Sequence, residues 1–104
     1  MSHAPALTDR EMTAIGKALA DPRRFRMLRE IAVAGTLCCQ EMRATHPVSA
    51  ATISHHMKEL EAAGLVEIVR QGKFALLRFR QDTMQRYLGQ LTGAFGAPLE
   101  SCDD

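Results

Sequence analysis

Hydrophobic and polar residues alternate with helical spacing over residues 49–64. A helix turns by ~100° per residue, so positions three and four apart lie on the same side. The inward side is expected to hold Ile53, His56, Met57 and Leu60, and the outward side Ala51, Ser54, His55 and Lys58. Ser49 suits the cap before this helix and Gly64 suits its end. The pattern predicts a helix with one side for a core and a small, polar, basic side for a ligand.

Helical spacing also predicts two longer helices before this one. Thr8 or Asp9 caps the first, which runs to about residue 20, and Asp21-Pro22 begins the second. The core side of the second helix is expected to carry Phe25, Leu28, Ile31 and Ala32. Its four arginines, Arg23, Arg24, Arg26 and Arg29, are expected mainly on a solvated face, with phosphate contact near the helix start as the lesser alternative.

The remaining segments predict a short helix, a hairpin and a final helix. Residues 39–45 form a short helix that ends near His46-Pro47, because a residue before proline avoids the helical region. Residues 65–70 and 73–80 flank Gln71-Gly72 as the two strands of a β-hairpin, and residues 82–91 form the last helix. The expected fold is mainly α with a β-hairpin, in the order α-α-α-α-β-β-α.

Two short helices joined by a tight turn, followed by a hairpin, are typical of a winged helix-turn-helix. Small outward side chains let the second helix approach a groove, while hydroxyl, imidazole and ammonium groups reach bases or phosphates. The predicted DNA contacts are Ser49, Ala51, Thr52, Ser54, His55 and Lys58 on this helix, with Arg70 and Lys73 on the hairpin. The alternative for each element is an ordinary solvated surface, but their combination favours binding to double-stranded DNA.

The chain resembles the arsenical-repressor (ArsR/SmtB) family of bacterial regulators over roughly residues 8–91. Residues 18–28, ALADPRRFRML, look like the opening of the family's second helix, and residues 52–60 with 63–66 look like its recognition helix and exit. The resemblance implies a cytoplasmic homodimer that represses at a palindromic promoter operator until an inducer arrives. It also implies a dimer interface on the first and last helices, here Met12, Ile15, Leu19, Met84, Tyr87, Leu88 and Leu91; the alternative is that these residues only cover the protomer core.

Composition and charge agree with one small DNA-binding domain. The chain has 104 residues with 46% hydrophobic content, expected as a domain over residues 8–92 between flexible tails at 1–7 and 93–104. A chain of this size gains stability from burying more surface in a dimer. The net charge is only +1, but residues 43–80 contain six basic and three acidic residues, so attraction to DNA depends on the local distribution.

Cys38 and Cys39 lie where the short helix of the DNA-binding pair begins. The positive end of a helix favours thiolate, which binds soft metals and reacts with oxidants. The resemblance matches Cys38 to the first cysteine of the family's Leu-Cys-Val-Cys-Asp motif, but Cys39 replaces the valine and Gln40 the second cysteine. Adjacent cysteines point ~100° apart on a helix, so both can bind one arsenite or other soft ion only if the helix start is irregular, and Cys102 is the candidate for the third thiolate. Oxidation to a disulfide or persulfide with Cys102, and inert cysteines, are the open alternatives.

Other functions have less support in the sequence. The last helix has no histidine, so the family's zinc or nickel site is not expected there, and His56 is expected to be a structural residue. No glycine-rich phosphate loop, serine elbow, carboxylate pair or zinc-hydrolase motif indicates an enzyme. The chain also lacks an apolar membrane run and a basic-then-apolar leader, which indicates a cytoplasmic protein. A winged helix used as a protein-interaction module is the remaining rival.

Overall fold

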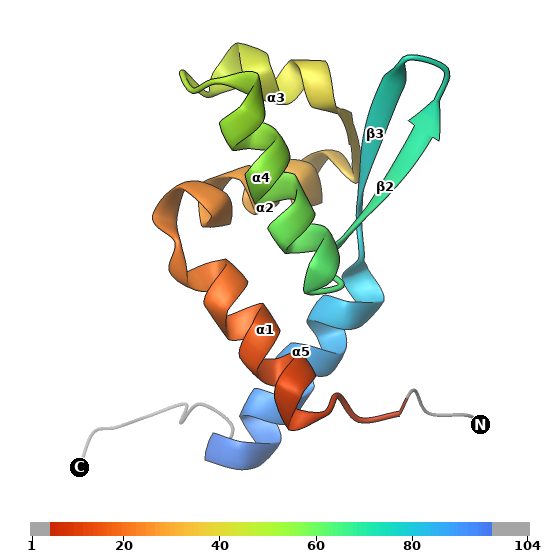
Figure 1. The fold of residues 1–104 in the computed structure, drawn as a ribbon. Coiled ribbons are helices and arrows are strands. Elements are labelled where there is room, and N and C mark those ends of the chain that lie inside the picture. The colour runs from red at the N-terminus through yellow and green to blue at the C-terminus, as the bar shows by residue number, and fades with distance from the viewer. Residues whose placement is uncertain (1–4, 97–104) are drawn as a thin grey trace.

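The computed structural model describes residues 5–96 as five helices and a small sheet (Figure 1). The elements are α1 (Asp9–Ala20), α2 (Pro22–Ala34), β1 (Thr36–Cys38), α3 (Cys39–Thr45), α4 (Ala50–Ala62), β2 (Val66–Gln71), β3 (Phe74–Phe79) and α5 (Gln81–Phe95). The predicted helices and hairpin are present in the predicted order.

 The observed ends lie within about two residues of the expected ones, except that α5 continues to Phe95.

Local sequence signals explain where these helices begin and end. Thr8 and Glu11 form a capping box at the start of α1, with Glu11 N donating to Thr8 Oγ1 and Thr8 N donating to Glu11 Oε1. The Asp21 carboxylate accepts from the backbone N–H groups of Arg23 and Arg24 at the start of α2. Gly64 ends the turn after α4 with φ of 77°, a conformation that costs residues with a Cβ.

The sheet has a third strand that the hydrophobic pattern did not predict. Its order is β1-β3-β2, and all pairs are antiparallel. In β1, Thr36 pairs with Arg78 and Cys38 with Leu76, while in β2, Ile68 pairs with Leu77. The sheet thereby ties the segment before α3 to the central strand of the wing.

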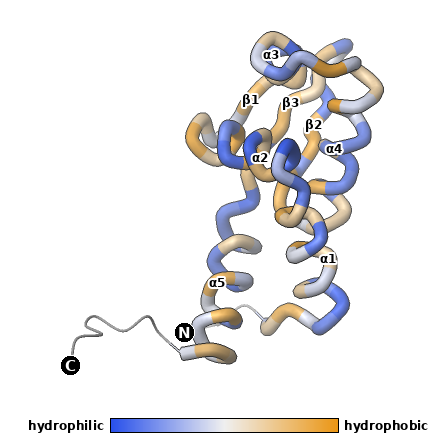
Figure 2. The backbone as a smooth tube through the Cα atoms, turned by 90° about the vertical axis from the view of Figure 1, so that its left-hand side faces the viewer, coloured by the Kyte–Doolittle hydropathy of each residue, from blue (hydrophilic) through white to orange (hydrophobic). Residues whose placement is uncertain are grey.

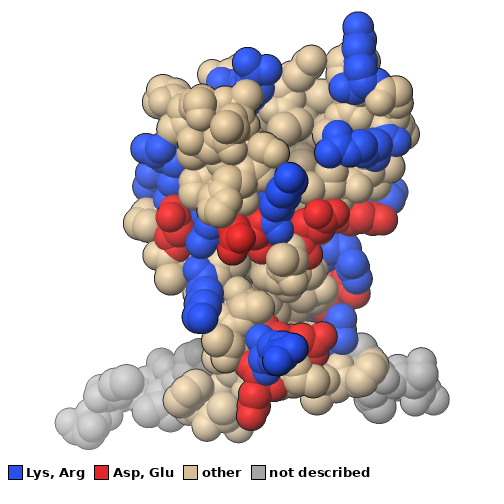
Figure 3. Space-filling model, viewed as in Figure 1, with Lys and Arg blue, Asp and Glu red and all other residues tan. Residues whose placement is uncertain are grey.

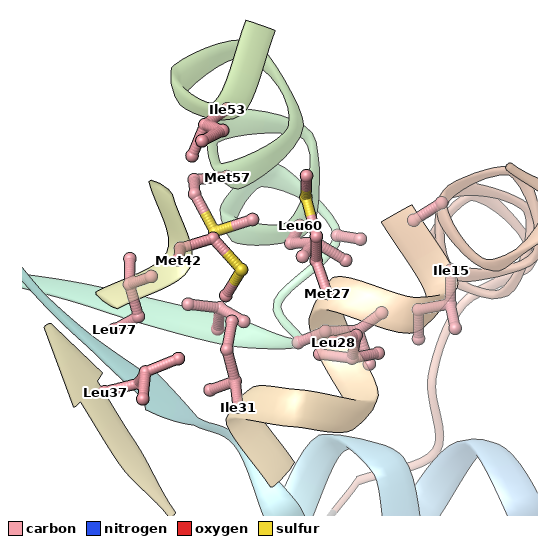
Figure 4. Close-up of a cluster of buried hydrophobic side chains, with 14 of the residues drawn as sticks. Ile15, Met27, Leu28, Ile31, Leu37, Met42, Ile53, Met57, Leu60 and Leu77 are labelled. Carbon is pink, nitrogen blue, oxygen red and sulfur yellow. The ribbon is translucent and has the colours of Figure 1, made fainter. Parts of the chain in front are cut away.

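The core lies where α2, α3 and α4 pack over one face of the sheet (Figure 4). The inward side of α4 is buried as predicted, with Ile53, His56, Met57 and Leu60. One prediction for α2 is wrong: Phe25 is 46% exposed and points out of the protomer, because the core side of α2 is filled by Met27, Leu28 and Ile31.

The two ends of the described chain pack differently from the expected tails. Leu7 is buried, and its backbone N–H and C=O are hydrogen-bonded to the side-chain amide of Gln90 on α5. Residues 93–95, expected in a tail, continue α5. Figure 2 shows the lower half of α5 extending away from the sheet, with hydrophobic turns along it. No helix in residues 5–96 is long and apolar enough to cross a membrane.

Candidate nucleic-acid interface

No segment among the described residues, 5–96, covers the outward side of α4. Ala51, Ser54, His55 and Lys58 are all exposed, opposite the buried stripe. Ser49 has a further role, because its Oγ accepts from Thr52 N at 3.1 Å and donates to Thr52 Oγ1 at 2.9 Å. This cap fixes the first turn of α4, which carries the small side chains that would approach a groove.

The turn between α3 and α4 is held to α2. His46 Nε2 lies 2.9 Å from Glu30 Oε1, and Thr45 Oγ1 donates to Glu30 Oε2 at 3.0 Å. Both contacts join the end of α3 to the middle of α2. These contacts therefore hold the turn of the helix-turn-helix against α2.

The wing carries two of the predicted basic contacts beside its turn. Arg70 and Lys73 are exposed on either side of Gln71-Gly72, where Gly72 has φ of 60°. Lys73 Nζ lies 5.7 Å from the ring centroid of Phe74, which is 40% exposed. The tip thus combines positive charge with an aromatic surface.

Ion pairs divide the six basic residues of residues 43–80 into two groups. Arg78 lies 3.5 Å from Glu67, and Arg80 lies 3.1 Å from Asp82. Within residues 5–96, no carboxylate pairs with the other four, which are Arg43, Lys58, Arg70 and Lys73. Figure 3 shows basic side chains over the upper part of the molecule and a band of acidic ones across its middle. The four unpaired residues lie on α3, on the exposed side of α4 and beside the turn of the wing.

The two neighbouring cysteines lie in different surroundings. Cys38 ends β1 opposite Leu76, while the adjacent pair Leu37 and Leu77 is buried in the core. Because strand side chains alternate, Cys38 and Leu76 belong to the opposite face of the sheet. Cys39 begins α3 and packs against the core.

The prediction that the helix start favours thiolate is wrong for Cys39. Burial raises the pKa of the Cys39 thiol, and the neighbouring Cys38 raises it further. Arg43 and Arg70 oppose this rise without reversing it. Cys102 lies outside the described residues. Within residues 5–96, no three His, Cys, Asp or Glu side chains are grouped to hold a metal ion.

Of the proposed dimer residues on α1 and α5, Met12, Leu19, Met84 and Tyr87 pack against the protomer core, and all but one of the full set keep part of their side chains in solvent. Leu88 is 48% exposed, while Met12, Leu19, Met84, Tyr87 and Leu91 are half-buried. An open groove of about 310 Å³ is lined by Leu19, Met84, Tyr87 and Leu88 together with Phe25 of α2. Ile15 is a correction, since it is fully buried in the core of its own protomer and has no surface for a partner.

Arg24 is a connecting residue that the sequence pattern did not reveal. It was expected on a solvated face, but its guanidinium contacts the end of α1 and His56 of α4. Its partners are two backbone carbonyls and a side chain 32 positions away. No local pattern specifies such contacts.

Comparison with known proteins agrees with this geometry. A family model described as a helix-turn-helix domain matches residues 19–69. The HTH-type transcriptional regulator YceK of Bacillus subtilis is 33% identical over 77% of this chain and 81% of its own length. The arsenic resistance transcriptional regulator ArsR1 of Pseudomonas putida is also 33% identical, over 81% of this chain and 66% of its own.

A solved structure extends the likeness to the fold. The homodimeric winged helix-turn-helix DNA-binding domain Mb0332 of Mycobacterium bovis, described as a possible ArsR-family regulator, matches with a TM-score of 0.66. It is 22% identical, and the match covers 97% of this chain and 99% of that one. The fold is that of a winged helix-turn-helix DNA-binding protein. The chain belongs to the ArsR family of transcriptional regulators, a class of DNA-binding proteins and not of enzymes.

Proposed function

We propose that this regulator is a homodimeric, cytoplasmic repressor that binds a palindromic promoter operator and is released by a thiol-reactive signal at Cys38 and Cys39. The observation that carries DNA contact is the exposed side of α4, with Ser54, His55 and Lys58, on the helix that precedes the basic wing. In this proposal Ser49, Ala51 and Thr52 bring the start of α4 close to the groove, and Arg70 and Lys73 contact phosphates.

Dimerisation through α1 and α5 is supported by the apolar groove and by the solvent exposure of most side chains of α5. Thr83 is the single buried residue of this helix of 15 residues, all of which the structure describes. Leu88 leaves a large apolar side chain in solvent, and a second copy would remove it from water. A two-fold dimer would then present two copies of α4 to two half-sites of an operator.

The sensing part of the proposal is supported by the position of the cysteines at the junction of β1 and α3. The Pseudomonas relative is by name an arsenic resistance regulator. The raised pKa of Cys39 favours the alternative for that residue, an inert half-buried thiol. Without Cys39, Cys38 and Cys102 supply two of the three ligands that trivalent arsenic takes, and a hydroxide from arsenite itself would remain as the third. The competing oxidation joins the same two thiols in a disulfide, while an added oxidant takes up two electrons and two protons.

Fluorescence anisotropy with the promoter of the protein's own gene tests the proposal. The reduced full chain is titrated first with arsenite and then with a mild oxidant, beside Cys38→Ser, Cys39→Ser and Cys102→Ser variants. Release by one agent that is lost in the Cys38 variant supports a thiol-regulated repressor and identifies its chemistry. Binding that neither agent alters indicates inert cysteines, and absence of promoter binding indicates the interaction module.

A further inference from the structure

The guanidinium group of Arg24 on α2 joins α1 and α2 to the recognition helix α4. Arg24 Nε donates to Ala18 O at 2.9 Å, and its Nη2 donates to Lys17 O at 3.3 Å. Both carbonyls belong to the last turn of α1, where backbone acceptors have no partner within the helix. Arg24 Nη1 lies 3.3 Å from Nδ1 of His56, on the buried side of α4.

The contact between Arg24 and His56 specifies the charge of the imidazole. A guanidinium group can only donate hydrogen bonds, so Nδ1 of His56 must be the acceptor. The ring is therefore neutral, with its proton on Nε2. Protonation at Nδ1 would remove the acceptor and place two cations in contact. Since His56 is 8% exposed, little water is available to screen them.

Charges on both packed helices surround this ring. Burial lowers the pKa of His56, Asp21 opposes that shift, and Arg24, His55 and Arg23 lower the pKa further. Arg26 lines the same small hollow as Asp21, Arg23 and His56. The ring of His55 has its centroid 5.8 Å from that of His56. Most of this surrounding charge is positive, and it disfavours a second cation at position 56.

We propose that the Arg24–His56 hydrogen bond positions α4 against the end of α1, and that tight DNA binding requires neutral His56. His56 is a positioning residue, because it faces the core while its neighbour His55 faces outward. The proposal depends on DNA binding through α4 and is independent of the cysteines. It also links α1, a helix of the proposed dimer surface, to the recognition helix through one side chain.

The expected effect is a loss of DNA affinity on acidification. A histidine with a lowered folded pKa is neutral in both states above 6.5, the ordinary value. As the pH falls below that value towards the folded pKa, the native arrangement loses stability relative to states with an exposed ring. Once the pH is below the folded pKa, affinity falls by at most about tenfold per pH unit for each protomer.

Operator binding by anisotropy from about pH 7.5 to about pH 5.5, at constant ionic strength, tests this effect. In His56→Asn, the amide supplies an acceptor near the position of Nδ1 but does not titrate, so its affinity should vary less with pH than that of the wild type. His3→Asn is the control, since it also removes a titratable ring, lies outside the described residues, and should retain the wild-type pH dependence. An unchanged pH dependence in His56→Asn overturns the proposal.

A titration of the wild-type chain keeps the proposal testable if the variant does not fold. The imidazole nitrogens of His56 are followed by NMR with and without operator DNA. If DNA binds the neutral form, thermodynamic linkage requires DNA to lower the pKa of His56 further. A pKa that stays constant or rises when DNA binds would exclude the proposed role.

Discussion

Replacing Arg70 with alanine tests whether the wing neutralises the DNA backbone. Arg70 is exposed beside the hairpin turn, and it forms no ion pair within residues 5–96. Each phosphate contact contributes about 0.9 to the slope of log affinity against log salt, so two protomers should together lose about 1.8. Between about 50 mM and about 200 mM salt, the variant should therefore lose about tenfold less affinity for DNA than the wild type loses.

Arg78→Ala is the matched control on the neighbouring strand. Arg78 is also exposed, but its guanidinium lies 3.5 Å from the Glu67 carboxylate, so its charge already has a partner. Anisotropy over a salt series, at a fixed concentration of labelled operator, gives the slope for each variant. An Arg70→Ala slope equal to that of the wild type would refute the reasoning, as would an equal decrease in Arg78→Ala.

Three further predictions concern stability and assembly. Leu60→Ala removes a fully buried side chain and should lower the free energy of unfolding by about 2–5 kcal/mol in urea titration; a loss below about 1 kcal/mol would contradict the packing described. Leu88→Arg should weaken the dimer in sedimentation while circular dichroism keeps its helical signal, and an unchanged dimer would place the interface elsewhere. Asp21 has a pKa below 3.8, chiefly through its hydrogen bond from Arg24 N, so its stabilisation is complete above that value and is lost as the pH falls through the lowered pKa. Asp21→Asn keeps a cap but should reduce this loss of stability at acid pH. An unchanged loss would show that other carboxyl groups cause it.

The recognition helix was predictable because its information is local. The spacing of Ile53, Met57 and Leu60 specifies the buried side, and Ser49 and Gly64 mark the ends. The hairpin was equally clear from its alternating residues and its turn. These signals depend on neighbours along the chain, which a single sequence shows directly.

Features that depend on distant partners were not predictable in this way. The strand β1 has three residues and exists because Thr36 pairs with Arg78, far along the chain. Phe25 has the spacing of a core residue, but the pattern could not show that the interior was already filled. The thiol of Cys39 illustrates the same limit, since burial outweighs the helix-end effect that position alone suggests.

Because β1 ends at Cys38 and α3 begins at Cys39, the cysteine pair directly connects the sheet to the helix-turn-helix. A displacement of Cys38 acts through Leu76 on the central strand, and from there on the strand that carries Arg70. The same displacement acts on the first turn of α3. If the proposed thiol signal acts at Cys38, it would therefore change both the angle of the wing and the position of the helix pair, without a ligand touching the recognition helix.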